Sequence, residues 1–108
     1  MLNTDDVRRI ALSLPGTVEK KRWNHPTFDV GGRMFLTVPD DQTSFAVRCP
    51  RLERDELIAA EPEKFWVPQH EAGSAWVRAR LSALEGTDEL HDIVLDSWQQ
   101  TAPDSLKS

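Results

Sequence analysis

The sequence contains a single cysteine and no long apolar run. Cys49 has no second cysteine to pair with, which excludes an internal disulfide and is typical of a reducing compartment. No segment reaches the roughly 18–20 apolar residues that span a bilayer, and the start MLNTDDVRR lacks the apolar centre of a signal peptide. A chain of 108 residues is close to the most common domain size. We therefore expect one cytoplasmic domain, residues 1–108.

Sequence motifs of catalysis are also absent. The chain has no Gly-rich phosphate loop, no Cys-x-x-Cys pair, no His-Glu-x-x-His helix and no Gly-x-Ser-x-Gly elbow. Cys49 could join His25, His70 or His91 in a thiolate or metal site. However, Cys49 falls on the apolar side of an expected strand, where a free cysteine usually packs as a small hydrophobe. We expect a protein without enzymatic activity, cofactor or metal.

Basic residues are missing from one long stretch. Residues 81–106 contain six acidic side chains and no Lys or Arg, whereas residues 8–33 contain six basic and two acidic side chains. The net charge of the chain is −5, which is unfavourable for a protein that binds nucleic acid. The fold decides whether the two oppositely charged regions cancel on one surface or lie on separate surfaces.

Hydrophobic periodicity and turn residues predict helices separated by short strands. Helices are expected at residues 5–14, 51–60 and 88–101, and strands at 18–23, 27–38 (a hairpin), 43–49, 65–67 and 76–81, with a turn at 40–42 and a flexible tail at 103–108. Thr4 is the expected N-cap of the first helix. The order of elements predicts an α+β, two-layer fold, in which helices pack on one face of an antiparallel sheet.

The hairpin segment TFDVGGRMFLTV permits two registers. A two-residue turn at Gly31 and Gly32 pairs Val30 with Arg33, whereas a three-residue loop pairs Val30 with Met34 and leaves Arg33 at the loop tip in solvent. We prefer the three-residue loop because it places the apolar side chains of both arms on one face. These side chains are Phe28, Val30, Met34, Leu36 and Val38, and the loop also pairs Phe28 with Leu36.

Basic and aromatic residues recur on the expected strands. Lys20 and Arg22 share one strand face, and Arg78 and Arg80 follow Trp76 on another. Cations interleaved with aromatic rings can contact phosphates and stack bases. The same cations could instead form the polar surface of a one-sided sheet and protect its edges. The candidate nucleic-acid contacts are Lys20, Lys21, Arg22, Arg33, Arg78 and Arg80.

A second hypothesis is a module that binds a protein or a small ligand. Trp23, Trp66, Trp76 and His70 could line a cleft beside the sheet, and the acidic last helix could dock a basic partner. His70 could equally close its own loop, PQHEAGSAW, by hydrogen bonds to the backbone. Another open alternative concerns Asp92 and Asp96, one helical turn apart near Glu89. They could hold a hard cation, although such a stripe is more often a solvated helix face.

Five segments of the chain resemble, in order, the MmcQ/YjbR family of small bacterial proteins. They are ALSLPGTVEKKRW, HPTFDVGGRMFLTV, SFAVRCP with the following ERDELIAAEPEKFWVPQH, GSAWVRARL, and DELHDIVLDSWQQTAP. Together they cover about residues 5–103. The most specific element is the turn Gly-Gly-Arg-Met-Phe, where the family has a basic residue after the glycines, and Arg33 takes that place here.

The resemblance implies an α+β domain similar to the bacterial frataxin CyaY, with two hairpin wings that touch DNA. It adds Arg48 to the candidate DNA contacts, beside Arg33, Arg78 and Arg80. It also leaves a frataxin-like metal role as a lesser alternative. We expect DNA as the partner, with an unidentified protein or small ligand as the alternative, no membrane association, and a monomer or weak dimer.

Overall fold

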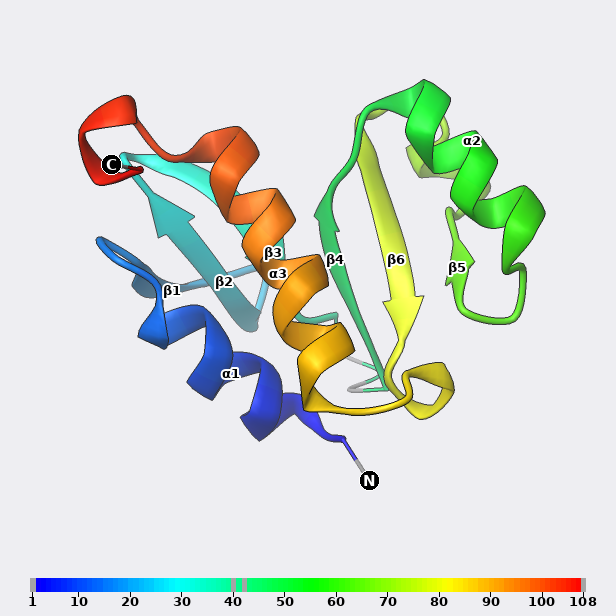
Figure 1. Ribbon diagram of the computed structural model, residues 1–108, viewed down its shortest axis with the longest axis horizontal. Helices are drawn as coiled ribbons and strands as arrows, with labels where there is room; N and C mark the ends of the chain where they lie inside the picture. Colours follow the sequence, from blue (N-terminus) through cyan, green and yellow to red (C-terminus); the bar gives the residue numbers. More distant parts are fainter. Residues whose placement is uncertain (1, 40, 42, 108) are drawn as a thin grey trace.

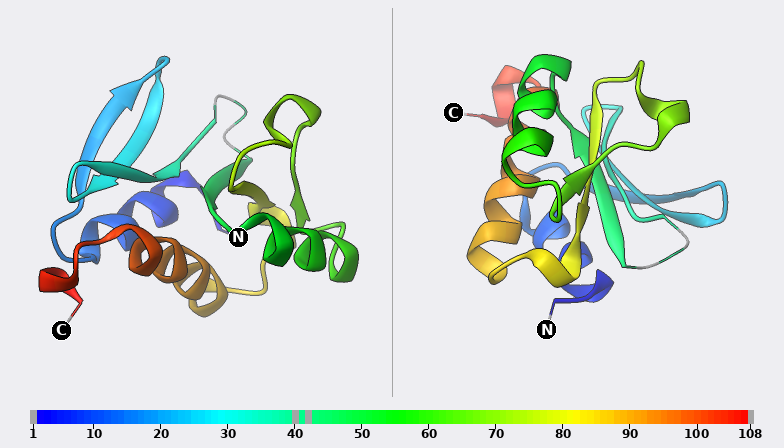
Figure 2. Two further views of the ribbon diagram at one scale, coloured as in Figure 1. Left: turned by 90° about the horizontal axis from the view of Figure 1, so that it is seen from above. Right: turned by 90° about the vertical axis from the view of Figure 1, so that its right-hand side faces the viewer.

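Within the residues that the computed structural model describes, 2–39, 41 and 43–107, six antiparallel strands form one sheet in the order β1-β2-β3-β4-β6-β5 (Figure 1). The strands are β1 (Val18–Arg22), β2 (His25–Val30), β3 (Arg33–Thr37), β4 (Ser44–Arg48), β5 (Phe65–Trp66) and β6 (Trp76–Arg80). The helices are α1 (Thr4–Ser13), α2 (Arg51–Ala60) and α3 (Thr87–Thr101), with 3-10 helices η1 (Gln69–Glu71), η2 (Leu81–Ala83) and η3 (Asp104–Leu106). The α-helices lie on one side of the sheet (Figure 2), so the expected two-layer α+β fold is confirmed. None of the described helices combines the length and the apolar character needed to cross a bilayer.

Helix α1 is capped by Asn3 and not by Thr4 as expected. The Asn3 side-chain oxygen accepts a hydrogen bond from the Asp6 N–H (3.1 Å), and the Asp6 carboxylate accepts one from the Asn3 N–H (2.9 Å). This reciprocal pair stabilises the helix start because it satisfies two backbone N–H groups. The buried face of α1 consists of Val7, Ile10 and Ala11.

The core lies between the sheet and helices α1 and α3. Its largest fully buried side chains are Phe28, Phe35, Phe45 and Leu36 from the strands and Leu90 from α3. Ser97 fixes α3 onto two strands, because its hydroxyl donates to the Phe35 carbonyl (2.5 Å) and accepts from the Arg48 N–H (2.9 Å). The Trp98 indole N–H donates to the Pro15 carbonyl (3.0 Å) and joins α3 to the chain after α1.

The β2–β3 hairpin turns at Gly31 and Gly32. Val30 pairs with Arg33 across this two-residue turn, so the expected three-residue loop is wrong. Both glycines have positive φ, 60° and 80°, which the tight turns that join antiparallel strands require. Arg33 is exposed, as expected, but it is the first residue of β3 and not part of a loop.

A β-bulge between Phe28 and Asp29 changes the register along the same hairpin. Beyond the bulge Phe28 pairs with Leu36, which is the pairing that the three-residue loop predicted. Phe35, the extra residue, and Leu36 are both fully buried, whereas regular alternation would place them on opposite faces. Met34 pairs with Asp29 and does not lie in the core, contrary to the expectation.

The β1–β2 hairpin turns at Trp23 and Asn24. Arg22 pairs with His25, and both turn residues have positive φ, 53° and 64°. The first strand therefore ends one residue before the expected Trp23, and the second begins at His25, in a segment expected to be irregular. Asparagine tolerates this backbone region, but tryptophan is uncommon in it.

Two further segments were expected to lack regular structure. Of the turn at residues 40–42, only Asp41 is described, and residues 40 and 42 lie outside the described residues. The Asp41 carboxylate accepts hydrogen bonds from the Thr43 N–H (2.9 Å) and the Ser44 hydroxyl (3.2 Å) at the start of β4. The expected flexible tail contains η3, whose Leu106 packs against the hydrophobic core.

The glycines of the β2–β3 turn provide a matched test of the turn geometry. A methyl group on Gly31 would lie 2.7 Å from Cδ of Pro103, whereas one on Gly32 would meet no atom within 4 Å. Both alanine variants force a side chain into the left-handed region, which costs roughly 1–2 kcal/mol. We expect Gly31→Ala to lower the free energy of unfolding by about 1 kcal/mol more than Gly32→Ala in urea denaturation. Equal losses would contradict the close approach of Pro103.

Candidate functional site

The face of the sheet away from the helices, here called the open face, carries five of the seven candidate DNA contacts. Paired residues on neighbouring strands point to the same side, and Ala46 pairs with Arg78 on the side opposite Phe45 and Val47 of the core. By the same pairing, the open face comprises Lys20, Arg22, Asp29, Met34, Ser44, Arg48, Trp66, Trp76, Arg78 and Arg80.

Two arms border the open face. The β1–β2 hairpin and the segment 67–75 around η1 both project away from the helices, as the left view of Figure 2 shows. A groove of about 280 Å³, here called the inter-arm groove, lies between them. Trp23, His25 and Met34 line it from one side, and Glu71, Trp76 and Arg78 from the other.

Trp23 lies at the tip of the first arm. Its side chain is 70% exposed, its ring centre lies 6.0 Å from that of His25, and its backbone is in the left-handed region. This conformation costs a side chain other than glycine roughly 1–2 kcal/mol. An exposed ring gains little from burial that would offset this cost, so packing alone does not account for Trp23 at this position.

Asp29 is a nearly buried carboxylate on the open face, with 3% exposure. Arg22 donates two hydrogen bonds to it (2.8 and 2.7 Å), and the Lys20 ammonium lies 3.6 Å away. The Arg22 guanidinium holds the pKa of Asp29 below its ordinary value of 3.8. Two candidate DNA contacts are therefore already paired, and they hold β1 against β2.

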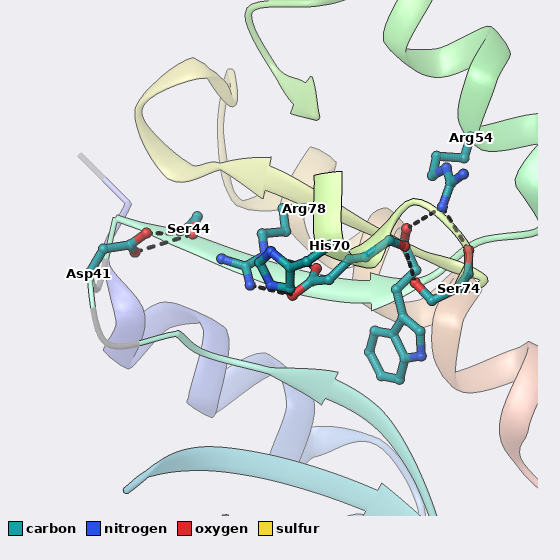
Figure 3. Close-up of polar contacts among 8 residues, drawn as sticks. Asp41, Ser44, Arg54, His70, Ser74 and Arg78 are labelled. Atoms are coloured by element: carbon teal, nitrogen blue, oxygen red, sulfur yellow. Dashed lines mark hydrogen bonds and ion pairs between the residues drawn. The ribbon is translucent and has the colours of Figure 1, made fainter. Parts of the chain in front are cut away.

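On the second arm, Glu71 pairs with Arg78, which is labelled in Figure 3, as Asp29 pairs with Arg22. Arg78 donates two hydrogen bonds to the Glu71 carboxylate (3.2 and 2.6 Å), and His70 Nε2 lies 3.3 Å from it. The charge of Arg78 is thus largely neutralised by Glu71 within the protein. Glu71 also places one carboxylate on the wall of the inter-arm groove.

Arg48 and Arg80 keep their charge without an acidic partner among the described residues. The Arg48 guanidinium lies 5.1 Å from the ring centre of Trp76, and that of Arg80 lies 4.2 Å from the ring centre of Trp66. Arg48 also donates to the Met34 carbonyl (2.7 Å), and Arg80 to the Glu63 carbonyl (3.0 Å). Burial, together with the charge of Arg33, lowers the pKa of Arg48. These contacts orient both cations on the open face.

The cations of the open face and the acidic stretch of α3 lie on separate surfaces, whereas Arg8 and Arg9 of the basic stretch lie on α1 and pair with Glu19 and Asp6. The open face holds five cations against the carboxylates of Asp29 and Glu71, and the exposed Lys21 and Arg33 pair with Pro26 and Val30 on the other side of the strands. The acidic side chains of α2 and α3 lie in the helix layer on the other side. The open face is therefore electropositive within a chain of net charge −5.

Comparisons with known proteins place this arrangement in a family. The family model described as YjbR matches residues 12–100. The chain belongs to the YjbR family. The crystal structure of the Deinococcus radiodurans protein DR2400, a DUF419 domain, is similar with a TM-score of 0.77 and 21% identity, over 93% of this chain and 78% of that one. This similarity confirms the fold alone. Among curated proteins, none matches the sequence.

Arg54 is a residue of this YjbR domain that the sequence did not single out. It is 4% exposed and donates to the carbonyls of Ala72 (2.9 Å), Ser74 (2.7 Å) and Trp76 (3.2 Å). Figure 3 shows Arg54 reaching from α2 to the loop that precedes β6. Arg54 thus positions the second arm, which carries Glu71. The sequence held one signal of this role. Arg54 lies one helical turn before the apolar Leu57, so both side chains are on the helix face that packs against the protein.

The structure brings together only part of the cleft expected from the sequence. Trp23 and Trp76 line the inter-arm groove, but the His70 side chain is 77% exposed and does not. Cys49 is buried in the core, and burial together with nearby Glu53 and Asp96 raises its thiol pKa to about 11. Within residues 2–39, 41 and 43–107, no three His, Cys, Asp or Glu side chains are arranged to hold a metal ion.

The pairing of Asp29 predicts a pH-dependent contribution to stability. Asp29→Asn removes the charged partner of Arg22 and lowers the free energy of unfolding by about 1–3 kcal/mol at about pH 7. Because the folded-state pKa lies below 3.8, this contribution is complete above about pH 4 and is lost as the pH falls through the folded-state pKa. Urea unfolding at about pH 7 and pH 3 measures it. Asp92→Asn, at an 82% exposed side chain, is the control. A difference that persists unchanged at low pH would contradict the pairing.

The contacts of Arg54 predict a large effect of its replacement. Arg54→Met keeps the apolar stem but leaves three carbonyls without their donor, so we expect a loss of about 2–4 kcal/mol in the free energy of unfolding. Arg51→Met, at an exposed position of the same helix, should change it by less than about 0.5 kcal/mol. Chemical denaturation measures both variants. Similar stabilities for the two would show that the loop before β6 does not depend on Arg54.

Proposed function

We propose that this YjbR domain binds DNA through its open face, with an unpaired strand in the inter-arm groove. The observation that carries the proposal is the position of Trp23 and Trp76 on opposite sides of a groove in an electropositive face. Cations that contact phosphates, together with aromatic rings that stack bases, are the features of surfaces that bind single strands.

The size of the inter-arm groove favours a single base. At about 280 Å³ it is slightly smaller than the roughly 300–1,000 Å³ of sites for drug-sized ligands. The bases of a duplex are stacked and paired, and they cannot enter such a groove without unpairing. An unpaired strand can place a base between Trp23 and Trp76 and its phosphates near Lys20 and Arg48 of the open face.

The ion pairs of the open face limit the affinity that we expect. Arg22 and Arg78 are each bonded to a carboxylate, so Lys20, whose side chain is 53% exposed, and the partly exposed Arg48 and Arg80 are the main phosphate contacts. Three contacts to a single strand predict a slope of log affinity against log salt of roughly −2. Binding in the micromolar range at low salt is the corresponding expectation.

A small aromatic ligand is a second candidate, favoured by Glu71. Its carboxylate on the groove wall repels phosphate but suits a neutral or cationic ring between Trp23 and Trp76. In this case the groove would bind a nucleoside or another heteroaromatic compound in the absence of a phosphate chain. Quenching of tryptophan fluorescence by nucleosides detects such binding.

The test of the DNA proposal is fluorescence anisotropy of a labelled oligothymidine of about 12 nucleotides, beside a duplex of equal length, at about 50 and 200 mM salt. We expect stronger binding of the single strand, weakened by salt. Trp23→Asn should lower that affinity about fivefold or more without loss of stability, because asparagine suits the turn. Arg80→Gln should reduce the salt slope.

Two matched controls lie on the other side of the molecule. Leu52→Asn removes an 81% exposed apolar side chain of α2, and Arg51→Gln removes an exposed charge of the same helix. Neither should change DNA binding as the groove variants do. Absence of binding at low salt, or equal binding by Trp23→Asn, would overturn the proposal. Quenching by a nucleoside without binding of the oligonucleotide would favour the second candidate.

A further inference from the structure

A second groove, here called the helix-layer groove, lies on the opposite side of the sheet from the inter-arm groove. It has a volume of about 230 Å³. Val47 of β4 and Val77 of β6 form its floor, Leu57 of α2 and Ile93 of α3 form its walls, and Phe65 and Cys49 also line it. In Figure 1, β4 and β6 are visible between α2 and α3, and side chains fill much of this gap, because Val47 and Val77 are only 3% and 1% exposed.

The rim of the helix-layer groove is acidic. Glu89, Asp92 and Asp96 of α3 line it, and the charges of both Glu53 and Asp96 act on the Cys49 thiol, so acidic groups flank Cys49 from both helices. Among the described residues the only basic one in the lining is Arg48, whose guanidinium lies on the open face against Trp76. Lys64 pairs with Glu89 and Glu61.

We propose that the helix-layer groove docks an amphipathic helix of a partner protein, with an apolar stripe in the groove and Lys or Arg side chains along both flanks. The acidic rim selects a cationic partner, since long basic side chains can lay their stems along the walls and place their charges near Asp92 and Asp96. The groove is smaller than the about 300 Å³ of small-molecule sites, but it can accept one or two apolar side chains.

The sheet topology favours a helix over a strand as the occupant. β4 lies between β3 and β6, and β6 lies between β4 and the two-residue β5, so among the described residues the floor of the groove offers little free strand edge for an added strand. A docked helix would instead lie between α2 and α3 and complete the helix layer. Its binding is independent of the inter-arm groove, because the two grooves are on opposite faces of the sheet.

The test uses three peptides of about 14 residues, long enough for about four helical turns. The first contains leucines at helical spacing among lysines, the second keeps the leucines but replaces lysine with glutamate, and the third is a scrambled leucine–lysine peptide without a stripe. Fluorescence anisotropy of the labelled peptides measures binding. Cys49 is the only cysteine and lines the groove, but it is buried, so it reacts with a thiol reagent only when the groove opens, and a docked peptide should hold the groove closed. We expect the first peptide alone to bind and to slow this reaction.

Variants then locate the binding site. Ile93→Gln in the wall, and Asp92→Asn combined with Asp96→Asn on the rim, should each weaken binding of the first peptide about tenfold. Leu52→Gln, and Asp88→Asn combined with Asp104→Asn, change exposed residues outside the groove and should not. If Ile93→Gln does not fold, the exposed aspartate variants and the Cys49 reaction still decide the question.

Three outcomes would overturn the proposal. The scrambled or glutamate peptide could bind as well as the first, or the Cys49 reaction could be unchanged at saturating peptide. In the third outcome, sedimentation shows that the protein associates with itself and slows its own Cys49 reaction as its concentration rises, which would make a second copy the occupant. DNA binding by the open face is measured separately, so failure here leaves that proposal intact.

Discussion

None of the described α-helices covers the open face, so its charged and aromatic side chains cover and pair with one another. This constraint explains why a nearly buried carboxylate is tolerated at Asp29, where Arg22 and Lys20 compensate it, and why Glu71 is held by Arg78. It also explains why Arg48 and Arg80 lie over tryptophan rings, since a ring attracts a cation that has no acidic partner among the described residues. The same cations that resemble a nucleic-acid surface in the sequence are thus part of the structure of the sheet.

The layers and most element boundaries could be predicted from the sequence, since apolar spacing and turn residues act locally. The register of the β2–β3 hairpin could not. Regular alternation treats Phe35 and Leu36 as facing opposite sides, but both are buried beneath the helices, and the Phe35 carbonyl accepts a hydrogen bond from Ser97 of α3. Phe35 at the bulge is thus hydrogen-bonded to Ser97, which lies 62 residues further along the chain, and no local sequence pattern contains this contact.

The sequence predicted which types of residue form the candidate site, but not which of these residues contact one another. The sequence predicts Trp23, Trp76 and several arginines on strands. The structure places Trp23 in the β1–β2 turn and Trp76 on β6, and both line one groove. The sequence does not indicate that Glu71 lines the same groove, or that Arg54 holds the loop between η1 and β6. Those contacts form between α2, η1 and β6, which are separate segments of the chain. His70 differs from its neighbour Glu71 for the same reason, since the turn of η1 directs one side chain to solvent and the other to Arg78.

The cations of the open face and the carboxylates of α3 give the molecule an electric dipole moment with a component directed across the sheet. The molecule measures 34 × 29 × 28 Å, whereas the Debye length at physiological salt is about 8 Å. A polyanion in contact with the open face therefore experiences the local arginines, and the acidic helices are screened by the intervening ions. At lower salt the dipole acts over longer distances and turns the protein toward the polyanion before contact. The net charge then governs how often the two molecules approach, and the dipole governs how they are oriented when they meet.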